Sequence, residues 1–304
     1  MFTGLSAFPL TPLNDDRIDQ RAFARLVEKL AAANVDSISV LGSTGAYAYL
    51  DRGERHRVAT LAVEHAGGVP VVAGVGGLRT RDVLTNVEDA QNAGVSALLL
   101  APMTYQPLTD DEVFGLFEDV IAAASVPIIV YDNPTTTRVD FSDELHARIS
   151  NLRGVRSIKI PPVDDGQSGP VDQSAVSARI AGLRSLVPDD VTIGISGDGA
   201  AVEALLAGAD AWYSVLAGLL PEQCIAIARA AIDGRADEAR QLSAELQPIW
   251  DLFTTFGSFR AVATLAELLG AVSHDNLPKP VRGLNAAGRK RVAEAAAAIG
   301  VLPA

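Results

Sequence analysis

The sequence predicts an α/β protein, a (β/α)8 TIM barrel with a C-terminal helical extension. Three observations lead to this prediction. Eight short apolar runs alternate with helical patterns over about the first 220 residues, which fits the size and order of such a barrel. Several runs are apolar throughout, as is typical of parallel strands covered on both faces. Helical patterns alone follow these runs. A doubly wound sheet is the alternative that a strand count leaves open.

The predicted strands form a regular series of short segments. Two of them begin with Val-Pro, at Val69 and Val126, and proline is tolerated at the first residues of a strand. The eight predicted ranges are 3–8, 35–41, 69–74, 95–101, 126–131, 155–160, 191–196 and 209–215.

The segments between these strands have the helical period. Residues 19–33 carry one apolar stripe behind Asp19, a residue that suits a helix N-cap. Thr109 and Glu112 fit a capping box that opens a helix over residues 110–124.

The end of the chain predicts a helical appendage. Pro221 suits the first turn of a helix, and Gly234 and Gly270 suit helix ends. We therefore divide the chain into a barrel, residues 1–220, and a C-terminal helical domain, residues 221–304. No Ser-rich or Gly-rich linker separates the two, so we expect the helices to pack on the barrel. The predicted helices are 221–233, 236–254, 258–270 and 285–300.

Composition excludes several classes of partner. The 304 residues carry a net charge of −12, which disfavours nucleic acid and anionic membranes. The single Cys224 cannot form an internal disulfide and fits a reducing compartment, so we expect a cytoplasmic protein. No apolar run approaches the roughly 20 residues that span a bilayer, and no signal peptide is expected.

Lys159 is the strongest candidate for chemistry. Active sites of such barrels lie at the carboxyl ends of the strands. Of the four lysines, Lys29, Lys159, Lys279 and Lys290, only Lys159 is flanked by apolar strand residues. Burial lowers the pKa of a lysine and frees a neutral amine for attack on a carbonyl. The alternative is a lysine at the barrel rim that pairs with a carboxylate.

Other polar residues follow neighbouring strands. Tyr131 ends the strand before Lys159, where a phenol could transfer protons, although it could equally be an interfacial tyrosine. Ser43 and Thr44 lie in a glycine-bracketed turn that could bind a carboxylate or simply cap a helix. The turn that begins at Gly197 could be a small anion site or only a tight turn.

Cofactor sites are not expected. The sequence contains no Walker loop, no G-x-S-x-G elbow and no dinucleotide fingerprint. Asp132 and Asp198 are the only carboxylates at predicted strand ends, and we expect no histidine to join them. We therefore predict neither a metal nor another cofactor.

Together these motifs resemble a known family. The turn Gly42-Ser43-Thr44-Gly45, the strand end Tyr131-Asp132-Asn133-Pro134 and Lys159 occur in the order seen in the dihydrodipicolinate synthase / N-acetylneuraminate lyase family. Members of this family are pyruvate-type class I aldolases. The resemblance covers essentially the whole chain and is specific for the superfamily, not for one substrate.

The resemblance implies a role for each motif. Lys159 would form a Schiff base with a 2-oxo acid, and Tyr131 would be the proton shuttle. Ser43 would connect Tyr131 to a proton relay, and Thr44 would bind the carboxylate of the 2-oxo acid. Gly197 would lie beside the bound acid. The resemblance also implies a homo-oligomer, either a tetramer or a dimer.

The chain departs from the synthase branch of the family around the second substrate. Thr136 stands where that branch has an arginine, and Arg138 lies two residues later. Thr104 occupies the position of the relay tyrosine, with Tyr105 next to it. Tyr213 replaces a small aliphatic residue beside bound pyruvate.

These features lead to one functional prediction and two alternatives. We expect a Schiff-base-forming lyase or aldolase that acts on pyruvate or another 2-oxo acid and is not the lysine-biosynthesis synthase. The alternatives are a sugar-acid dehydratase that uses the same lysine imine, and a non-catalytic ligand-binding barrel. The expected partner is a small-molecule 2-oxo acid, with no nucleic acid and no membrane.

Overall fold

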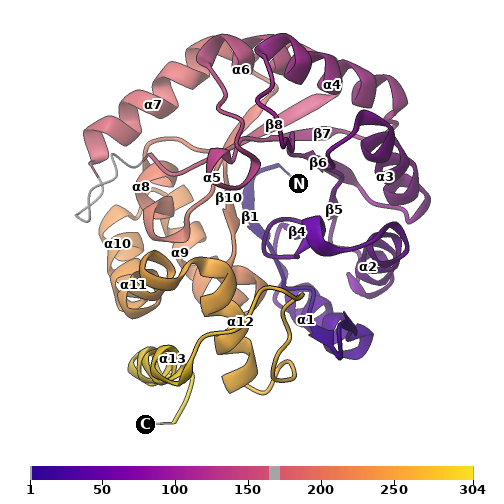
Figure 1. Cartoon of the computed structure of the whole chain (residues 1–304). Coiled ribbons are helices and arrows are strands. Elements are labelled where there is room, and N and C mark those ends of the chain that lie inside the picture. The colour runs from indigo at the N-terminus through magenta and orange to yellow at the C-terminus, as the bar shows by residue number, and fades with distance from the viewer. Residues whose placement is uncertain (1, 164–171, 304) are drawn as a thin grey trace.

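The computed structural model describes residues 2–163 and 172–303. Eight parallel strands close into a barrel, and helices surround it (Figure 1). This confirms the predicted (β/α)8 fold and excludes the doubly wound sheet. Around the barrel the strands follow the order β1-β10-β9-β8-β7-β6-β5-β4. Their bounds are β1 (Gly4–Ala7), β4 (Ser37–Val40), β5 (Val71–Gly74), β6 (Ala97–Leu100), β7 (Ile128–Tyr131), β8 (Val155–Ile160), β9 (Thr192–Ile195) and β10 (Ala211–Ser214).

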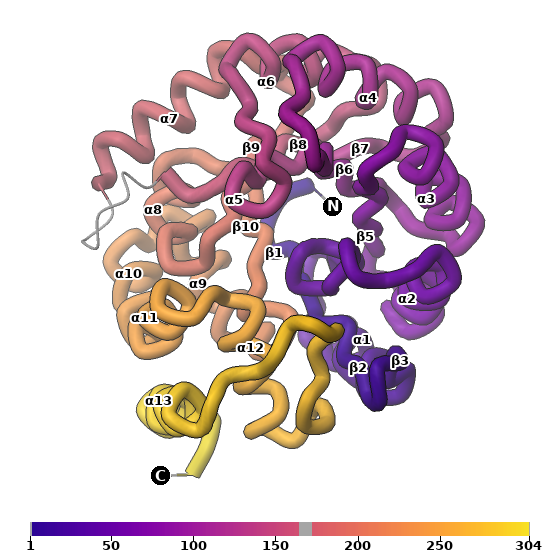
Figure 2. Tube along the Cα trace, viewed as in Figure 1, coloured from indigo at the N-terminus to yellow at the C-terminus, as the bar shows by residue number. Residues whose placement is uncertain are grey.

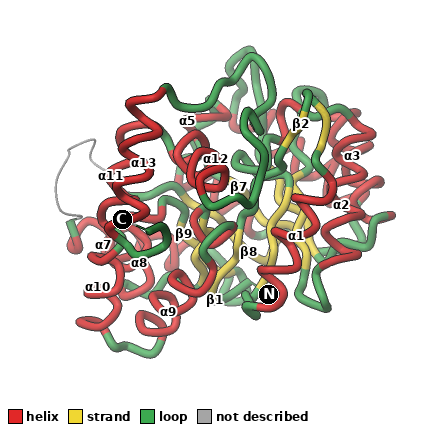
Figure 3. The backbone as a smooth tube through the Cα atoms, turned by 90° about the horizontal axis from the view of Figure 1, so that it is seen from below, coloured by secondary structure: helices red, strands yellow, loops and turns green. Residues whose placement is uncertain are grey.

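Each barrel strand lies within its predicted range. In β5 and β6 every residue is buried, which explains why these strands have no polar alternation in the sequence. Figure 3 shows the strands inside the ring of helices, with the N-terminus near one end of the strands and α5 (Pro134–Thr137) at the opposite end. Because α5 follows β7, that opposite end is the carboxyl end of the barrel.

Among the helices around the barrel, α1 buries the apolar stripe predicted for residues 19–33. In α1 the Asp19 side chain accepts a hydrogen bond from the Ala22 amide, as the N-cap prediction requires. Thr109 and Glu112 form both hydrogen bonds of a capping box at the start of α4. These helices are α1 (Gln20–Ala32), α2 (Arg52–His65), α3 (Thr80–Asn92), α4 (Asp110–Ala123), α6 (Asp143–Ser150), α7 (Gln173–Leu186) and α8 (Ala201–Leu206).

The C-terminal helices gather on one side of the barrel, next to α8 (Figure 1). The prediction of a single helix over 236–254 is wrong, because the helix is interrupted at Leu246. Pro248 lacks an N–H group, and its ring would clash with the carbonyl one turn earlier, so a new helix starts there instead. The bounds are α9 (Pro221–Ile232), α10 (Ala236–Glu245), α11 (Gln247–Phe256), α12 (Ser258–Leu268) and α13 (Ala286–Ala298).

Several contacts connect the C-terminal helices to the beginning of the chain. Helix α9 packs against β1. Figure 2 shows the segment between α12 and α13 passing near the hairpin of β2 (Leu13–Asn14) and β3 (Arg17–Ile18). There the Leu13 amide donates to the Asn276 carbonyl over 2.9 Å. The division of the chain into two domains at residue 220 stays a prediction.

None of the helices in the described residues combines the length and the apolar character that a membrane crossing requires.

Candidate active site

Lys159 lies on β8 with its side chain inside the barrel, only 4% exposed. The register of the parallel strands sets it directly beside Tyr131 on β7. Its Nζ atom lies 3.8 Å from the centroid of the Tyr131 ring and 4.1 Å from that of Phe8. Burial lowers the pKa of the amine, and the nearby Tyr131 and Asp198 oppose that shift. The amine is therefore enclosed by aromatic rings, an arrangement suited to a nucleophile.

The Tyr131 hydroxyl has hydrogen-bonding neighbours on two sides, Ser43 and Asn133, besides the Lys159 amine. Its oxygen lies 3.3 Å from the Ser43 Oγ atom, which agrees with the pairing that the family resemblance implies. It also accepts a hydrogen bond of 2.8 Å from the Asn133 side-chain amide. Sequence reasoning gave Asn133 no role of its own. The available signal was its position, two residues after Tyr131 in the same strand end.

The turn after β4 places Ser43 and Thr44 at the carboxyl end of the barrel. Thr44 is buried, and both Leu41 and Ala46 have a positive φ close to 60°. Gly42 is required because a Cβ atom there would lie 2.7 Å from the Phe8 ring. The tight turn therefore brings a hydroxyl group close to Tyr131 and packs against the aromatic wall around Lys159.

Two aromatic residues form that wall together with Tyr131. Phe8 and Tyr213 meet edge to face, with ring centroids 6.0 Å apart. The Tyr213 hydroxyl is 2.7 Å from Ser157 Oγ, and burial raises the pKa of this phenol. The centroid of the Tyr213 ring lies 5.8 Å from the Lys159 amine, farther than that of Phe8. The sequence does not predict that Phe8 contacts the amine. Phe8 follows β1 in an apolar run, so its position by itself indicated only core packing.

Asp198, which follows β9, hydrogen-bonds to residues in and after the neighbouring strand β10. Its buried carboxylate accepts hydrogen bonds from Trp212 Nε1 and from the amides of Val215 and Leu216, at 3.1, 3.2 and 2.7 Å. Burial raises the pKa of this carboxyl, and these donors oppose the rise. Because these three donors satisfy its carboxylate, Asp198 stabilises the backbone around Val215 and Leu216.

Gly197 precedes Asp198 and has a φ of +86°, in the region that favours glycine. A Cβ atom there would lie 2.8 Å from the Pro162 ring. Both constraints explain a glycine at this point without a ligand, so its place beside a bound acid stays a prediction.

One expectation about the carboxylates is wrong, because a histidine does join Asp132. His146 on α6 is fully buried, and its Nε2 atom lies 3.1 Å from Asp132 Oδ2. The His146 ring also stacks on Phe141. The two residues lie 14 positions apart, and only the packing of α6 against the strand end brings them together. Within residues 2–163 and 172–303, no three His, Cys, Asp or Glu side chains gather in a manner suited to a metal ion.

Three predicted binding residues, Thr104, Tyr105 and Arg138, are not among the residues that contact the Lys159 amine. Tyr105 is 85% exposed, and the Thr104 hydroxyl donates to the Gln106 carbonyl. Arg138 is exposed just after α5, with a φ of +58°. In the described part of the chain, none of them has a hydrogen bond to Lys159, Tyr131 or Ser43. Their roles at the site stay predictions.

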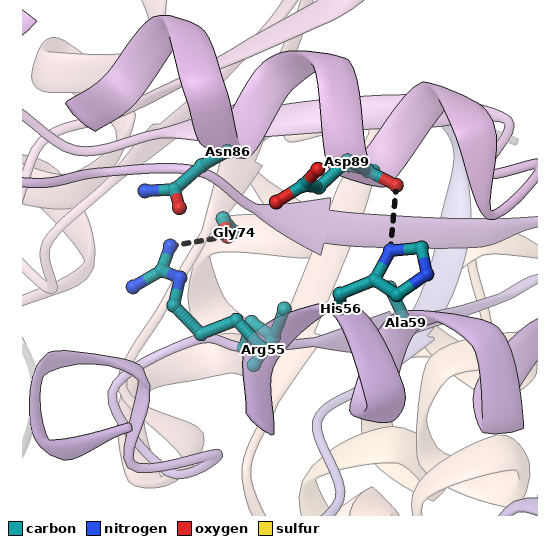
Figure 4. A pocket seen from close by; sticks show the side chains of 8 residues that line it. Arg55, His56, Ala59, Gly74, Asn86 and Asp89 are labelled. Carbon is teal, nitrogen blue, oxygen red and sulfur yellow. Dashed lines mark hydrogen bonds between the residues drawn. The ribbon is translucent and has the colours of Figure 1, made fainter. Parts of the chain in front are cut away.

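A separate cavity of about 470 Å³ lies between α2 and α3. Arg55 reaches into this region from α2 and donates to the carbonyls of Tyr47 and Gly74, each over 2.9 Å. Burial lowers the pKa of this guanidinium to about 10. Figure 4 shows the adjoining narrow space, with Arg55 pointing toward Gly74 and His56 bonded to the Asp89 carbonyl.

The barrel and its enclosed lysine define a lyase of the class I aldolase type. The chain belongs to the dihydrodipicolinate synthetase family, whose model matches residues 1–299. It is 30% identical over 287 residues to the 4-hydroxy-tetrahydrodipicolinate synthase of Persephonella marina, covering 92% of each chain. The enzyme of the same name from Hyphomonas neptunium is 32% identical over 248 residues, 81% of each chain. The crystal structure of dihydrodipicolinate synthase from Agrobacterium tumefaciens is 44% identical, with a TM-score of 0.92 over 98% of both chains.

Proposed function

We propose that this protein is a Schiff-base-forming lyase or aldolase that acts on pyruvate or another 2-oxo acid. The observation that carries the proposal is the buried amine of Lys159, held against the Tyr131 ring. A lysine in this setting has a lowered pKa, so more of it is neutral and nucleophilic than of a solvated lysine.

The proposed reaction begins with attack of Lys159 Nζ on the C2 carbonyl carbon of the acid. A C–N bond forms as the C=O π bond breaks, and Tyr131 passes one proton of the amine to the oxygen, which becomes the hydroxyl of a carbinolamine. Tyr131 then gives its own proton to this hydroxyl, which leaves as water as the nitrogen lone pair forms the C=N bond. The Tyr131 oxygen regains a proton through Ser43, which lies next to it.

The imine then makes the adjacent carbon reactive. Because it is conjugated with the carboxylate carbon, it can accept the electron pair released when a C3–H or C3–C bond breaks. Thr44 and its neighbouring amides would bind the carboxylate, and Gly197 would leave room beside it. Tyr213 would limit the space near the reacting carbon, since its ring is part of the wall around the amine.

We propose that the acceptor differs from that of the 4-hydroxy-tetrahydrodipicolinate synthases to which the chain is similar. The support is Thr136, an exposed uncharged residue at the position where the resemblance places an arginine. Arg138, Thr104 and Tyr105 would then contribute to the acceptor side of the pocket. The test compares kcat/KM for the reaction of pyruvate with aldehydes that carry a carboxylate group and with aldehydes that lack one. Higher kcat/KM for the carboxylated aldehyde would contradict the proposal.

We also propose a cytoplasmic homo-oligomer, a dimer or a tetramer. Cys224 is buried as a free thiol, which fits a reducing compartment. Loops after the adjacent strands β4, β5 and β6 carry exposed apolar side chains, which a second copy could cover. These residues are Tyr49, Leu78, Tyr105 and Leu108. Light scattering after size-exclusion chromatography should give a mass at least twice the 31.7 kDa of one chain, and a monomer would refute the assembly.

Trapping with borohydride tests the central step. With pyruvate present, reduction should add one stable adduct to the intact mass of the protein. The adduct should be absent in Lys159→Ala and retained in Lys290→Ala, since Lys290 is exposed on α13. No adduct in the unmodified protein would contradict the proposal and favour a non-catalytic barrel. An adduct together with water elimination from deoxy-keto sugar acids would identify the dehydratase instead.

A further inference from the structure

The Tyr131 hydroxyl receives a donor from its own strand end. Asn133 Nδ2 lies 2.8 Å from the Tyr131 oxygen, closer than Ser43 Oγ at 3.3 Å. A side-chain amide N–H donates a hydrogen bond but does not release its proton near neutral pH. Asn133 therefore cannot relay a proton, and it acts on the Tyr131 oxygen only by electrostatic attraction.

The same hydrogen bond directs the Tyr131 proton. A phenolic hydroxyl has one proton to donate and can accept through its oxygen. With Asn133 donating to that oxygen, the Tyr131 proton is left to point toward Ser43 or toward the atom that reacts with Lys159. Thr104, which occupies the position of the family's relay tyrosine, donates its hydroxyl to the Gln106 carbonyl instead.

Hydrogen bonds of the backbone around Asn133 fix the position of its side-chain amide. The Asn133 carbonyl accepts bonds from the Thr137 amide and hydroxyl, at 3.0 and 2.9 Å. On its other side, the Asp132 amide donates to the Lys159 carbonyl over 3.0 Å, and the Asp132 side chain is paired with His146. Because both flanking peptides are anchored, the donor is preorganised for charge that develops on the Tyr131 oxygen.

We infer that Asn133 is a positioning residue for proton transfer by Tyr131. When Tyr131 gives its proton to the departing oxygen, its own oxygen becomes negatively charged. A hydrogen-bond donor stabilises that phenolate more than the neutral phenol. The inference rests on the proposed function, because it assigns Asn133 to the proton shuttle of that reaction.

The test measures a half-reaction that needs no acceptor. Formation and collapse of the pyruvate enamine exchanges the methyl protons of pyruvate with D2O, which NMR follows. Asn133→Ala should reduce the exchange rate about 10-fold to 100-fold, the range for a hydrogen bond to a charged group. Asn133→Asp keeps the side-chain shape, replaces the donor by a carboxylate, and should reduce the rate at least as much. Asn92→Ala, an exposed position at the end of α3, should leave it unchanged.

Two readouts separate positioning from a merely structural role. In a Tyr131→Phe background, Asn133→Ala should change the residual rate by less than about threefold, because the interaction is already gone. Asn133→Ala should also lower kcat for the exchange and leave the KM for pyruvate unchanged, because Asn133 contacts the Tyr131 hydroxyl, whose proton transfer is needed only in the reaction itself.

The possible failures are distinguishable. An equal loss of rate in both backgrounds, or a raised KM with an unchanged kcat, would overturn the role of Asn133. Where Tyr131→Phe leaves no measurable exchange, the comparison of kcat with KM decides, and Asn133→Asp decides if Asn133→Ala does not fold. Absence of a borohydride adduct in the unmodified protein would instead overturn the proposed function.

Discussion

The amine of Lys159 lies 3.8 Å from the centroid of the Tyr131 ring because β7 and β8 pair with these residues side by side. This relationship combines two requirements of imine chemistry. The lysine is kept out of water, which lowers its pKa, and a phenol lies next to it to move protons. The neighbouring rings of Phe8 and Tyr213 complete the enclosure.

The burial of Lys159 should reduce stability at neutral pH. The folded-state pKa of the amine is lowered, so between that pKa and the ordinary value near 10.4 the unfolded chain binds more protons than the folded chain. Stability therefore rises with pH in this window. We expect Lys159→Met to have a higher Tm than the unmodified protein at pH 7, and the difference should shrink toward pH 10. Lys290→Met, at an exposed position, should show no such trend. A Tm difference that grows with pH would contradict the prediction.

Removing the Tyr131 hydroxyl should affect chemistry far more than folding. Tyr131→Phe keeps the ring against Lys159, so the Tm should change little, while general acid–base catalysis is lost. We expect kcat to fall about 10²-fold to 10⁴-fold, as is usual for such a group. Ser43→Ala should lower kcat less, because the Tyr131 hydroxyl that donates the proton stays in place. Steady-state kinetics with thermal unfolding checks both, and similar kcat values for Tyr131→Phe and the unmodified protein would refute the shuttle.

Phe8 should control the size of the 2-oxo acid. Phe8→Leu retains an apolar side chain and should lower the free energy of unfolding by less than Phe8→Ala, which should cost about 3–5 kcal/mol. Because the Phe8 ring lies 4.1 Å from the Lys159 amine, a smaller residue leaves room beside the reacting carbon. The rate of adduct formation with 2-oxobutanoate relative to pyruvate should rise in Phe8→Leu.

A matched control separates this effect from general loosening of the core. Phe117 on α4 is buried like Phe8. It lies between the helices and the outer surface of the barrel, away from the Lys159 amine. Phe117→Leu should lower stability without changing the preference between the two acids. The same change of preference in both variants would show that Phe8 has no specific role.

The pairing of Asp132 with His146 should be detectable as coupling. His146→Leu leaves the buried Asp132 side chain without its hydrogen-bond partner and should destabilise the protein by about 1–3 kcal/mol. Adding Asp132→Asn should cost less in this background than in the unmodified protein, because the contact is already gone. Urea unfolding of the four proteins gives the coupling energy. Additive effects would show that the two side chains do not depend on each other.

Much of the fold could be predicted from local patterns. Each barrel strand lies within a run of apolar residues, and the stripe of α1 and the capping box of α4 follow local rules. The break before Pro248 also has a local cause that the helical period concealed. Local reasoning suffices here because side-chain periodicity and capping involve residues only a few positions apart.

The sequence by itself determined the alternation of strands and helices, the choice of Lys159 among four lysines and the motifs of the family. Only the tertiary structure decided that Phe8 faces the amine, that His146 pairs with Asp132 and that the Asn133 amide donates to Tyr131. The physical reason is that the first set depends on patterns along the chain. The second depends on strand register, on the packing of α6 and on the local backbone path after β7, which together decide which atoms meet.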